Sequence, residues 1–517
     1  MARSRFKRNK MQQPRNPEEN FAIKLFKNVD ENIKNLKKML DEPDDLITRE
    51  FTVGQKNHKC AIVYIDGLVD NMSIQNNILK NLQINMGEQQ LPDVPEEVLD
   101  IIYQEKISIS DIKEGKTLDD VSNAILSGDT VFFLDQLDVV LIIDTKGGEH
   151  RQIEEPQSET LVRGPREGFI EDVGTNVALL RRYIQDPNLR FKTHQIGRRG
   201  KRKLVVSYVD GIIHPDIVKE VNRRLKTIDM DDAPESGFIE EWIEDSRLSP
   251  FPQIQNTERP DATAKALLQG KIAILLDGTP FVLIAPLTLS NALQSAEDYN
   301  ERWTIGTLLR GLRYLAAFIS LFLPALYIAL IAFHPGLIPS KLTFSIAASR
   351  EGVPFPAFVE AVTMGITMEL LREAGARLPK TIGDTIGIVG GLVIGEAAVQ
   401  AGIVSPIMVI IVALTAIASF SMPTYSLAIA FRMIRFAFMI AAAVLGLYGI
   451  ILVYIMINIH IVNLTSIGVP YSTPFAPSFF RDWKDLVLRA PITMLTRRPA
   501  YMDTNDSIPT DKGEEGS

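Results

Sequence analysis

Four side chains in an apolar part of the chain have the types and the spacing needed to line an ion pathway. They are Val389, Val393, Glu396 and Gln400. Intervals of four, three and four residues place them on one face of a helix. Repeated around the axis of an oligomer, that face would form two apolar rings, then a carboxylate ring and an amide ring. This arrangement is typical of a cation-conducting pore with a hydrophobic gate.

The carboxylate of Glu396 is also compatible with two different roles, and the sequence leaves them open. A charged group inside a bilayer is costly, so it marks either a polar pathway or a buried partner. Glu396 could pair with Arg372, Arg377 or another group inside one subunit's bundle, or its helix face could be exposed at the lipid interface. The pore is our leading hypothesis, and the internal ion pair is its main competitor.

The same segment, residues 382–402, carries a row of glycines at four-residue intervals. The row consists of Gly383, Gly387, Gly391 and Gly395. Small residues let two membrane helices approach closely, because no side chain separates their backbones. We therefore predict that these glycines form a flat helix-packing seam.

Charged residues also interrupt the preceding apolar segment, residues 355–376. They include Glu360, Glu369, Arg372 and Glu373. Spacings of three and four residues allow local ion pairs on one helix. The segment is either a span that faces a polar interior or a helix that lies in the membrane interface, and the sequence does not decide between them.

Catalytic motifs are absent from the sequence. It contains no P-loop, no Gly-x-Gly-x-x-Gly, no metal-ligand spacing and no nucleophile elbow. Its single cysteine, Cys60, excludes an intramolecular disulfide and a cysteine-rich metal site. Turn chemistry explains the aspartates at four repeated positions, which are Asp66, Asp135, Asp210 and Asp277. We therefore expect a protein that is not an enzyme, with no cofactor and no metal site.

The elements that would position these residues belong to two parts of different composition. The chain has 517 residues, of which 46% are hydrophobic, and a net charge of -8. Those averages hide long apolar segments from residue 312 onward, and a run of about 20 apolar residues spans a bilayer as a helix. The predicted spans are 312–333, 382–402, 404–422 and 436–459, with 355–376 as the undecided fifth. A soluble single-domain protein and a wholly embedded one are both excluded.

A duplication organises the half that precedes the first span. The matching segments are Cys60–Asp70 (CAIVYIDGLVD) with Leu204–His214 (LVVSYVDGIIH), and Ala124–Asp144 with Ala266–Pro286. Both pairs are offset by nearly the same length, 144 residues from Asp66 to Asp210 and 142 from Asp135 to Asp277. An apolar run closed by Asp-Gly indicates a strand that enters a turn. We predict two similar α/β subdomains with mixed sheets, because hairpins are present.

The remaining boundaries follow from composition and charge. The predicted domains are a basic disordered head with a helical lead-in (1–49), subdomain 1 (50–146), a linker with a helix (147–189), subdomain 2 (190–288), a pre-membrane helix (289–311), a membrane domain of four or five spans (312–462), and a Pro-rich, basic and then acidic tail (463–517). A basic cluster at 198–203 has no interleaved aromatic residues. We therefore expect a solvated hairpin tip there and no nucleic acid partner.

Charge placement predicts how the chain is oriented. Arg302, Arg310 and Arg313 precede the first span and no signal peptide is present, so the soluble half is expected in the cytoplasm. Five crossings would put the tail outside, whereas an interfacial segment 355–376 would put it inside. Basic residues in the tail favour the inside, and those at 372–380 favour five crossings. The side of the tail stays open.

Three segments resemble the A subunits of GerA-type spore germination receptors. They are residues 162–191 (VRGPREGFIEDVGTNVALLRRYIQDPNLRF), 209–213 (VDGII) and 354–379 (PFPAFVEAVTMGITMELLREAGARLP). The motif residues of the first segment are Arg163, Gly164, Pro165, Arg166, Glu167, Gly168, Asn176, Arg181, Arg182, Asp186 and Pro187. The order of a two-subdomain soluble half, a multi-span half and a Pro-rich tail is also similar. The resemblance covers about residues 20–500.

The resemblance implies a multi-pass protein of the inner membrane of dormant endospores that acts in nutrient-triggered germination. It implies an oligomeric ion channel, expected to be a pentamer, that releases monovalent cations. The expected partners are a permease-like B subunit that binds the germinant, a lipoprotein C subunit and membrane lipids. The family also includes spore proteins that are not nutrient receptors, and the sequence does not assign this chain to either group.

Three functions are compatible with these patterns. In a ligand-gated cation channel, Val389 and Val393 would close a dewetted gate and Glu396 would favour cations. A secondary transporter would use Glu360, Glu369 and Glu396 as coupling sites near the midplane, although no inverted repeat is visible. The third function is a non-conducting signalling scaffold whose soluble half assembles partners.

Overall fold

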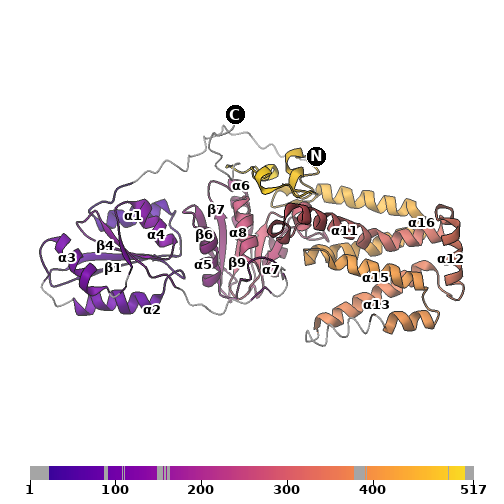
Figure 1. Ribbon diagram of the computed structural model, residues 1–517, viewed down its shortest axis with the longest axis horizontal. Coiled ribbons are helices and arrows are strands. Elements are labelled where there is room, and N and C mark those ends of the chain that lie inside the picture. Colours follow the sequence, from indigo (N-terminus) through magenta and orange to yellow (C-terminus); the bar gives the residue numbers. More distant parts are fainter. Residues whose placement is uncertain are drawn as a thin grey trace. The chain divides into compact units, whose positions relative to one another are not determined.

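The computed structural model describes residues 23–506, apart from 87–90, 108, 110, 148–154, 157, 158, 160–162, 378–390, 392 and 487. Its contacts divide the chain into two compact units (Figure 1). The first unit consists of Met1–Ile243, Asn256–Ala285 and Thr496–Ser517, and the second consists of Glu244–Gln255 and Pro286–Leu495. Each unit has its own buried hydrophobic core.

Two five-stranded sheets with equivalent strand order form the first unit. The first sheet has the order β1-β2-β4-β5-β3, with β1 (Leu46–Val53), β2 (His58–Ile65), β3 (Ile112–Gly115), β4 (Thr130–Leu134) and β5 (Val140–Ile143). The second has the order β6-β7-β9-β10-β8, with β6 (Leu189–Ile196), β7 (Arg202–Val209), β8 (Gln255–Thr257), β9 (Ile272–Leu276) and β10 (Val282–Ala285). The duplication predicted from the sequence therefore produces the same topology twice.

The strand directions differ from the prediction. Every neighbouring pair in the first sheet is antiparallel. The β6–β7, β7–β9 and β9–β10 pairs of the second sheet are antiparallel as well. The prediction of mixed sheets is wrong for the first sheet, because the helical connection between β2 and β4 returns the chain in the opposite direction rather than making a parallel crossover.

Helices cover both faces of the first sheet (Figure 1). α1 (Val29–Met39) and α4 (Leu118–Leu126) lie on one face, and α2 (Asn71–Ser73) and α3 (Pro95–Ile101) lie on the other. Successive residues of β2 serve the two cores in turn, with Ala61 and Val63 on the α1 side and Cys60 and Ile62 on the α3 side. A strand covered on both faces is apolar throughout, which explains the uninterrupted run CAIVYI.

Each repeat begins with a helix that precedes its first strand. In the first repeat, the side chain of Asn32 accepts from the amide of Phe26 at 2.8 Å and donates to its carbonyl at 2.6 Å. In the second repeat, Asn176 makes the same pair of bonds to Ile170, at 2.9 and 2.5 Å. The equivalent of α1 is therefore α5 (Val173–Tyr183), inside the segment that we predicted to be a linker.

Two of the repeated aspartates have a more specific role than turn formation. Oδ1 of Asp135 accepts from the amide of Val29 at 3.2 Å, and Oδ1 of Asp277 accepts from the amide of Val173 at 3.3 Å. Each carboxylate thus satisfies one of the free amides at the start of its repeat's first helix. The second repeat also contains α6 (Pro215–Leu225), α7 (Ser236–Ile243) and α8 (Pro260–Leu268).

Helices dominate the second unit. They are α9 (Leu289–Ala292), α10 (Glu297–Asn300), α11 (Trp303–Ala332), α12 (Ser340–Arg350), α13 (Ala357–Arg377), α15 (Pro406–Phe420) and α16 (Tyr425–Asn463), and residues 393–400 are helical as well. A small hairpin, β11 (Thr465–Ser466) and β12 (Val469–Pro470), follows α16. α11 and α16 are long and apolar enough to cross a membrane, and α15 is a shorter apolar helix. Figure 1 shows α11, α13 and α15 alongside one another, and α13 packs against α11, α15 and α16.

The long helix α16 folds back on itself. A straight helix of its 39 residues would be about 58 Å long. Both of its ends nevertheless lie beside α9. At the first end, the hydroxyl of Thr424 donates to the carbonyl of Ala292 at 2.8 Å. Just beyond the other end, the carbonyl of Tyr471 accepts from the amide of Leu289 at 2.9 Å. The reversal lies at Gly446, whose φ of 61° and ψ of -140° are not helical.

Two glycines explain why the reversal lies at this point. A Cβ at Gly446 would lie 2.9 Å from Cε1 of His334, so the turn packs tightly on the end of α11. A Cβ at Gly449 would lie 2.2 Å from the carbonyl oxygen of Ala441, so the two arms of α16 approach closely. The helix predicted as one span over 436–459 is therefore interrupted at Gly446. The sequence did not indicate this reversal, since an apolar helical hairpin has the same hydropathy as one long helix.

Candidate functional site

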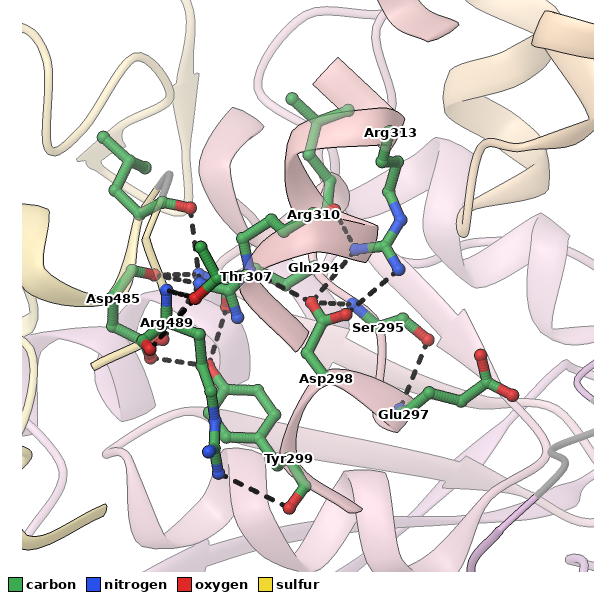
Figure 2. Close-up of polar contacts among 12 residues, drawn as sticks. Gln294, Ser295, Glu297, Asp298, Tyr299, Thr307, Arg310, Arg313, Asp485 and Arg489 are labelled. Atoms are coloured by element: carbon green, nitrogen blue, oxygen red, sulfur yellow. Dashed lines mark hydrogen bonds and ion pairs between the residues drawn. The ribbon is translucent and has the colours of Figure 1, made fainter. Parts of the chain in front are cut away.

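A buried cluster of opposite charges joins the start of α11 to the short helix before it (Figure 2). Asp298 of α10 is fully buried and accepts hydrogen bonds from two arginines of α11. Nε of Arg310 lies 3.1 Å from its Oδ2, and Arg313 reaches both carboxylate oxygens, at 3.0 and 3.1 Å. Buried charges are tolerated when they are paired and hydrogen-bonded, so these three groups hold one another in place.

The C-terminal tail completes this junction cluster. The carboxylate of Asp485 accepts from Nη1 of Arg310 at 3.0 Å and from the hydroxyl of Tyr299 at 2.5 Å (Figure 2). Its backbone carbonyl also accepts from Arg310, at 2.8 Å. Four residues later, the amide of Arg489 donates to the hydroxyl of Thr307 at 3.2 Å. The tail is therefore fastened to the first turns of α11.

The junction cluster places the C-terminal tail beside the start of α11. Because the tail contacts α10 and the beginning of α11, the tail and the approach to the first long apolar helix lie at the same end of this helical unit. Gly306 makes the close approach possible, since a Cβ there would lie 2.7 Å from the carbonyl oxygen of Asp298. The cluster has no nucleophile–base pair, and its paired charges hold α10, α11 and the tail together. Movement of the tail, α10 or α11 would leave a buried charge unpaired.

Three of the four predicted pore residues lie on an exposed face of the helix that contains residues 393–400. Val393 is 55% exposed, and Glu396 and Gln400 are exposed as well. Nε2 of Gln400 donates to Oε1 of Glu396 at 3.0 Å. The fourth residue, Val389, lies outside the part of the chain that the structure describes.

The competing hypothesis, in which Glu396 pairs with an arginine of α13, does not match the contacts. Arg372 pairs with Glu369, and Arg377 pairs with Glu373 at 2.7 Å. Both arginines that the sequence offered as internal partners of Glu396 are thus bonded to carboxylates of their own helix.

The predicted glycine seam is visible in part. A Cβ at Gly395 would lie 3.4 Å from Cγ1 of Val409, so this glycine packs directly on α15. Gly391 has open space beside it, and Gly383 and Gly387 lie outside the described residues. The helix therefore turns one glycine toward α15 and leaves Val393 and Glu396 exposed.

The carboxylates of α13 fulfil structural roles in the second unit. Glu360 is buried, lies 3.0 Å from Nη2 of Arg350, and accepts at 2.8 Å from the amide of Ser405, the residue that caps α15. Glu369 contacts Arg372 on its own helix and Nη2 of Arg435 on α16, at 3.1 Å. Both acids thus connect different helices.

Several residues of the 162–191 motif hold the first unit together. Arg181 is buried, forms a two-pronged ion pair with Asp45 at 3.0 and 3.1 Å, and lies over the ring of Phe191 at 4.7 Å. Since Asp45 precedes β1 and Arg181 belongs to α5, this pair connects the two repeats. The carbonyl of Pro187 accepts from Nη1 of Arg190 at 2.8 Å.

The other motif residues form hydrogen bonds inside the first unit or lie exposed on its surface. The carbonyl of Pro165 accepts from Nη2 of Arg259 at 3.0 Å, Asp186 accepts from the amide of Asn188 at 2.8 Å, and Glu167 accepts from the hydroxyl of Tyr183 at 3.3 Å. Gly168 is buried. The exposed motif residues are Arg163, Gly164, Pro165, Arg166 and Arg182.

Burial shifts the pKa of some groups in the first unit that the sequence did not point to. It raises the pKa of the Glu159 carboxyl to about 7, although the hydroxyl of Thr257 donates to that group at 2.6 Å. It lowers the pKa of Lys271 to about 8 and raises that of the Cys60 thiol to about 12. Within the described residues, no group of three or more His, Cys, Asp or Glu side chains could hold a metal ion.

The sequence did not reveal the junction cluster, and one signal could have found it. Arg310 and Arg313 look like orientation charges before the first span, although their three-residue spacing already places both on one helix face. Their acidic partners, Asp298 and Asp485, lie 12 and 175 residues from Arg310, and no local pattern links them.

Comparison with known proteins gives a family match over most of the chain. A family model described as Bacillus/Clostridium GerA spore germination protein matches residues 34–501. Spore germination protein GerLA of Bacillus cereus is 49% identical over 485 residues, which are 94% of this chain and 98% of that protein. Spore germination protein KA of Bacillus subtilis (strain 168) is 45% identical over 478 residues, 92% of this chain and 87% of that protein.

A solved structure is also similar in sequence. It is the crystal structure of the N-terminal domain of the A subunit of the Bacillus megaterium spore germinant receptor GerK3. It is 36% identical, covers 51% of this chain and 97% of that chain, and superposes with a TM-score of 0.40.

Proposed function

The chain belongs to the GerA family of Bacillus/Clostridium spore germination proteins, and we propose that it is the A subunit of a nutrient germinant receptor. In this proposal it forms an oligomeric, ligand-gated cation channel in the spore inner membrane. The family membership confirms the resemblance seen in residues 162–191 and 354–379. The channel rests on one observation, the exposed face of Val393, Glu396 and Gln400 on a helix that packs its Gly395 against α15.

Energetics favour water rather than lipid next to this face. A carboxylate that faces lipid is expensive, so a membrane helix with an exposed glutamate gains from an environment that hydrates it. Five copies around an axis would surround Glu396 with water and give a ring of carboxylates, each oriented by Gln400 at 3.0 Å. Val389 and Val393 would form the narrow apolar part, which excludes water and ions when it is closed.

We propose six membrane passes rather than four or five. They are α11, α13, the helix that contains residues 393–400, α15 and the two arms of α16. Support comes from the reversal at Gly446 and from the packing of α13 against three other helices. An even number of passes agrees with the attachment of the tail to the start of α11. With Arg302 and Arg310 before the apolar part of α11, the soluble half and the tail would be cytoplasmic.

The gating proposal involves the partners that the family resemblance implies. A permease-like B subunit would bind the germinant, and a lipoprotein C subunit would complete the complex. Germinant-loaded partners would shift the population toward the open oligomer by binding it better than the closed one. The junction cluster supplies a rigid link through which displacement of α10 or of the tail would reach α11.

Release of K⁺ from liposomes that contain the purified full-length chain tests the pore. Val393→Ala should increase the leak in the absence of germinant, because a wider constriction wets more easily. Glu396→Gln should lower the ratio of cation to anion flux. The matched control is Ile410→Ala, which changes an exposed apolar residue of α15 outside the predicted face and should leave the leak unchanged.

Each competing function has its own outcome in this experiment. Unchanged ion retention in both Val389→Ala and Val393→Ala would contradict this gate. An oligomer that never conducts, even with its partners present, would favour the signalling scaffold. Cation flux that depends on a solute gradient would favour a secondary transporter, in which Glu360 and Glu369 would first have to leave their arginine partners.

A further inference from the structure

A cavity in the second unit combines apolar walls with an excess of positive charge. It has a volume of about 710 Å³ and lies between α13, α15 and the first arm of α16. Its apolar lining includes Ala361, Met368, Val412, Ala416 and Met439. Its ionic lining is Glu369, Arg372, Arg432 and Arg435, three guanidinium groups against one carboxylate.

The single carboxylate does not satisfy all three arginines. Glu369 contacts Arg372 and lies 3.1 Å from Nη2 of Arg435, but Nε of Arg432 is 4.0 Å away. Arg432 is only 5% exposed, and among the residues that the structure describes its Nε and Nη2 find no hydrogen-bond acceptor. Nε of Arg372 is also buried without an acceptor there. Buried guanidinium donors without an acceptor are costly, so an anion bound in the cavity would stabilise the protein.

The depth of the arginines suits a lipid headgroup. Arg432 lies seven residues after the start of α16, about 10 Å along the helix. That end of α16 is anchored by Thr424 to Ala292, at the end of the unit where α11 begins. Basic pockets between membrane helices on the cytoplasmic side bind anionic lipid headgroups.

We propose that this cavity binds the phosphate group of an anionic phospholipid through Arg432, Arg435 and Arg372, with an acyl chain along the apolar walls. A free phosphate would carry suitable charge but would fill only a small part of the cavity. An ion of its size replaces only a few water molecules, each of which occupies about 30 Å³. The volume is typical of sites that enclose larger organic ligands. The proposal requires that the unit lie in a bilayer, and it does not require that the protein conduct ions.

Thermal unfolding of the full-length chain in a neutral detergent tests the site with three probes. Phosphatidylglycerol should raise the unfolding midpoint, whereas phosphatidylcholine and inorganic phosphate should not. Arg432→Met should weaken the phosphatidylglycerol effect at least ten-fold in concentration, because a charge-assisted hydrogen bond is lost. The matched control is Arg377→Met, which changes an exposed arginine of α13 that pairs with Glu373 outside the cavity.

A second variant tests the cavity without changing its charge. Ala416→Leu would narrow the apolar wall and should weaken the phosphatidylglycerol effect while all three arginines remain. This variant decides the matter if Arg432→Met fails to fold. Equal stabilisation by inorganic phosphate would overturn the lipid in favour of a free anion. Stabilisation of both variants as strong as that of the unaltered chain, or no stabilisation by any probe, would overturn the site itself.

Discussion

Asp485 in the C-terminal tail accepts a 3.0 Å hydrogen bond from Nη1 of Arg310, 175 residues earlier in the chain. Arg310 also donates to Asp298 at 3.1 Å, so one buried guanidinium is shared between the tail and the helix before α11. Three separate segments therefore depend on the same cation. A change in any one of them alters the electrostatic environment of the other two, so the junction cluster links three segments within the helical unit.

Replacing Asp298 with asparagine should destabilise the chain by about 3–5 kcal/mol, because two buried arginines lose their shared counter-charge. Thermal unfolding in detergent measures the loss. The control is Glu373→Gln, which removes an exposed ion pair with Arg377 and should cost less than about 1 kcal/mol. Equal losses in the two variants would contradict a structural role for the junction cluster.

Asp485→Ala should loosen the tail without unfolding the helices. Hydrogen bonds to charged groups contribute about 1.5–3 kcal/mol, so amide exchange in residues 480–490 should become at least ten-fold faster. Hydrogen exchange followed by mass spectrometry measures this segment directly. Lys484→Ala, an exposed neighbour, serves as the control and should leave the exchange rate unchanged. The tail is not held by Asp485 if exchange stays slow in the first variant.

Gly446→Ala should destabilise the helical unit by about 1–3 kcal/mol. The backbone at this position has a φ of 61°, which strains any residue with a Cβ, and that Cβ would meet His334 at 2.9 Å. Gly311→Ala in α11 is the control, because a Cβ there meets nothing within 4 Å. It should be neutral or stabilising by up to about 1 kcal/mol. Tolerance of alanine at both positions would argue against a reversal at Gly446.

The partly buried Glu159 should make stability depend on pH. Its ordinary pKa is 4.5, and burial raises the pKa to about 7 in the folded state. The folded chain therefore binds more protons than the unfolded chain between these values. The resulting stabilisation is complete below pH 4.5 and is lost as the pH rises through 7.

The Glu159→Gln variant tests this dependence. At roughly 1.4 kcal/mol for each pH unit, the wild-type chain should lose up to about 3 kcal/mol that the variant keeps. Comparing unfolding midpoints of both chains across this pH range measures the difference. Glu155→Gln changes an exposed carboxyl and should behave like the wild type. Parallel pH profiles for wild type and Glu159→Gln would rule out this titration.

Local patterns in the sequence predicted much of the first unit. The Asp-Gly turns after β2 and β7, and the matching segments at β4 and β9, indicated two repeats with the same order of strands. They could not indicate strand direction, which depends on how the long connection between β2 and β4 returns. The pairing of Asn32 with Phe26, which shows that α1 and α5 are equivalent, depends on a single side chain that no periodicity reveals.

In the second unit, hydropathy and side-chain spacing predicted where apolar helices occur and which face of 393–400 carries Glu396. They could not distinguish a straight α16 from one that reverses at Gly446, because both have the same hydropathy.

The sequence by itself determined the division into a duplicated α/β part and an apolar helical part, the family, and the candidate pore face. These depend on composition and on residues a few positions apart. Tertiary structure alone decided which charges meet, including Arg310 with Asp485 and Glu369 with Arg435. Packing also placed Arg432 and Arg435, which follow the predicted span 404–422 in the sequence, in the wall of a cavity. The physical reason is that ion pairs between distant segments form only when whole helices pack, and that packing depends on all their contacts together.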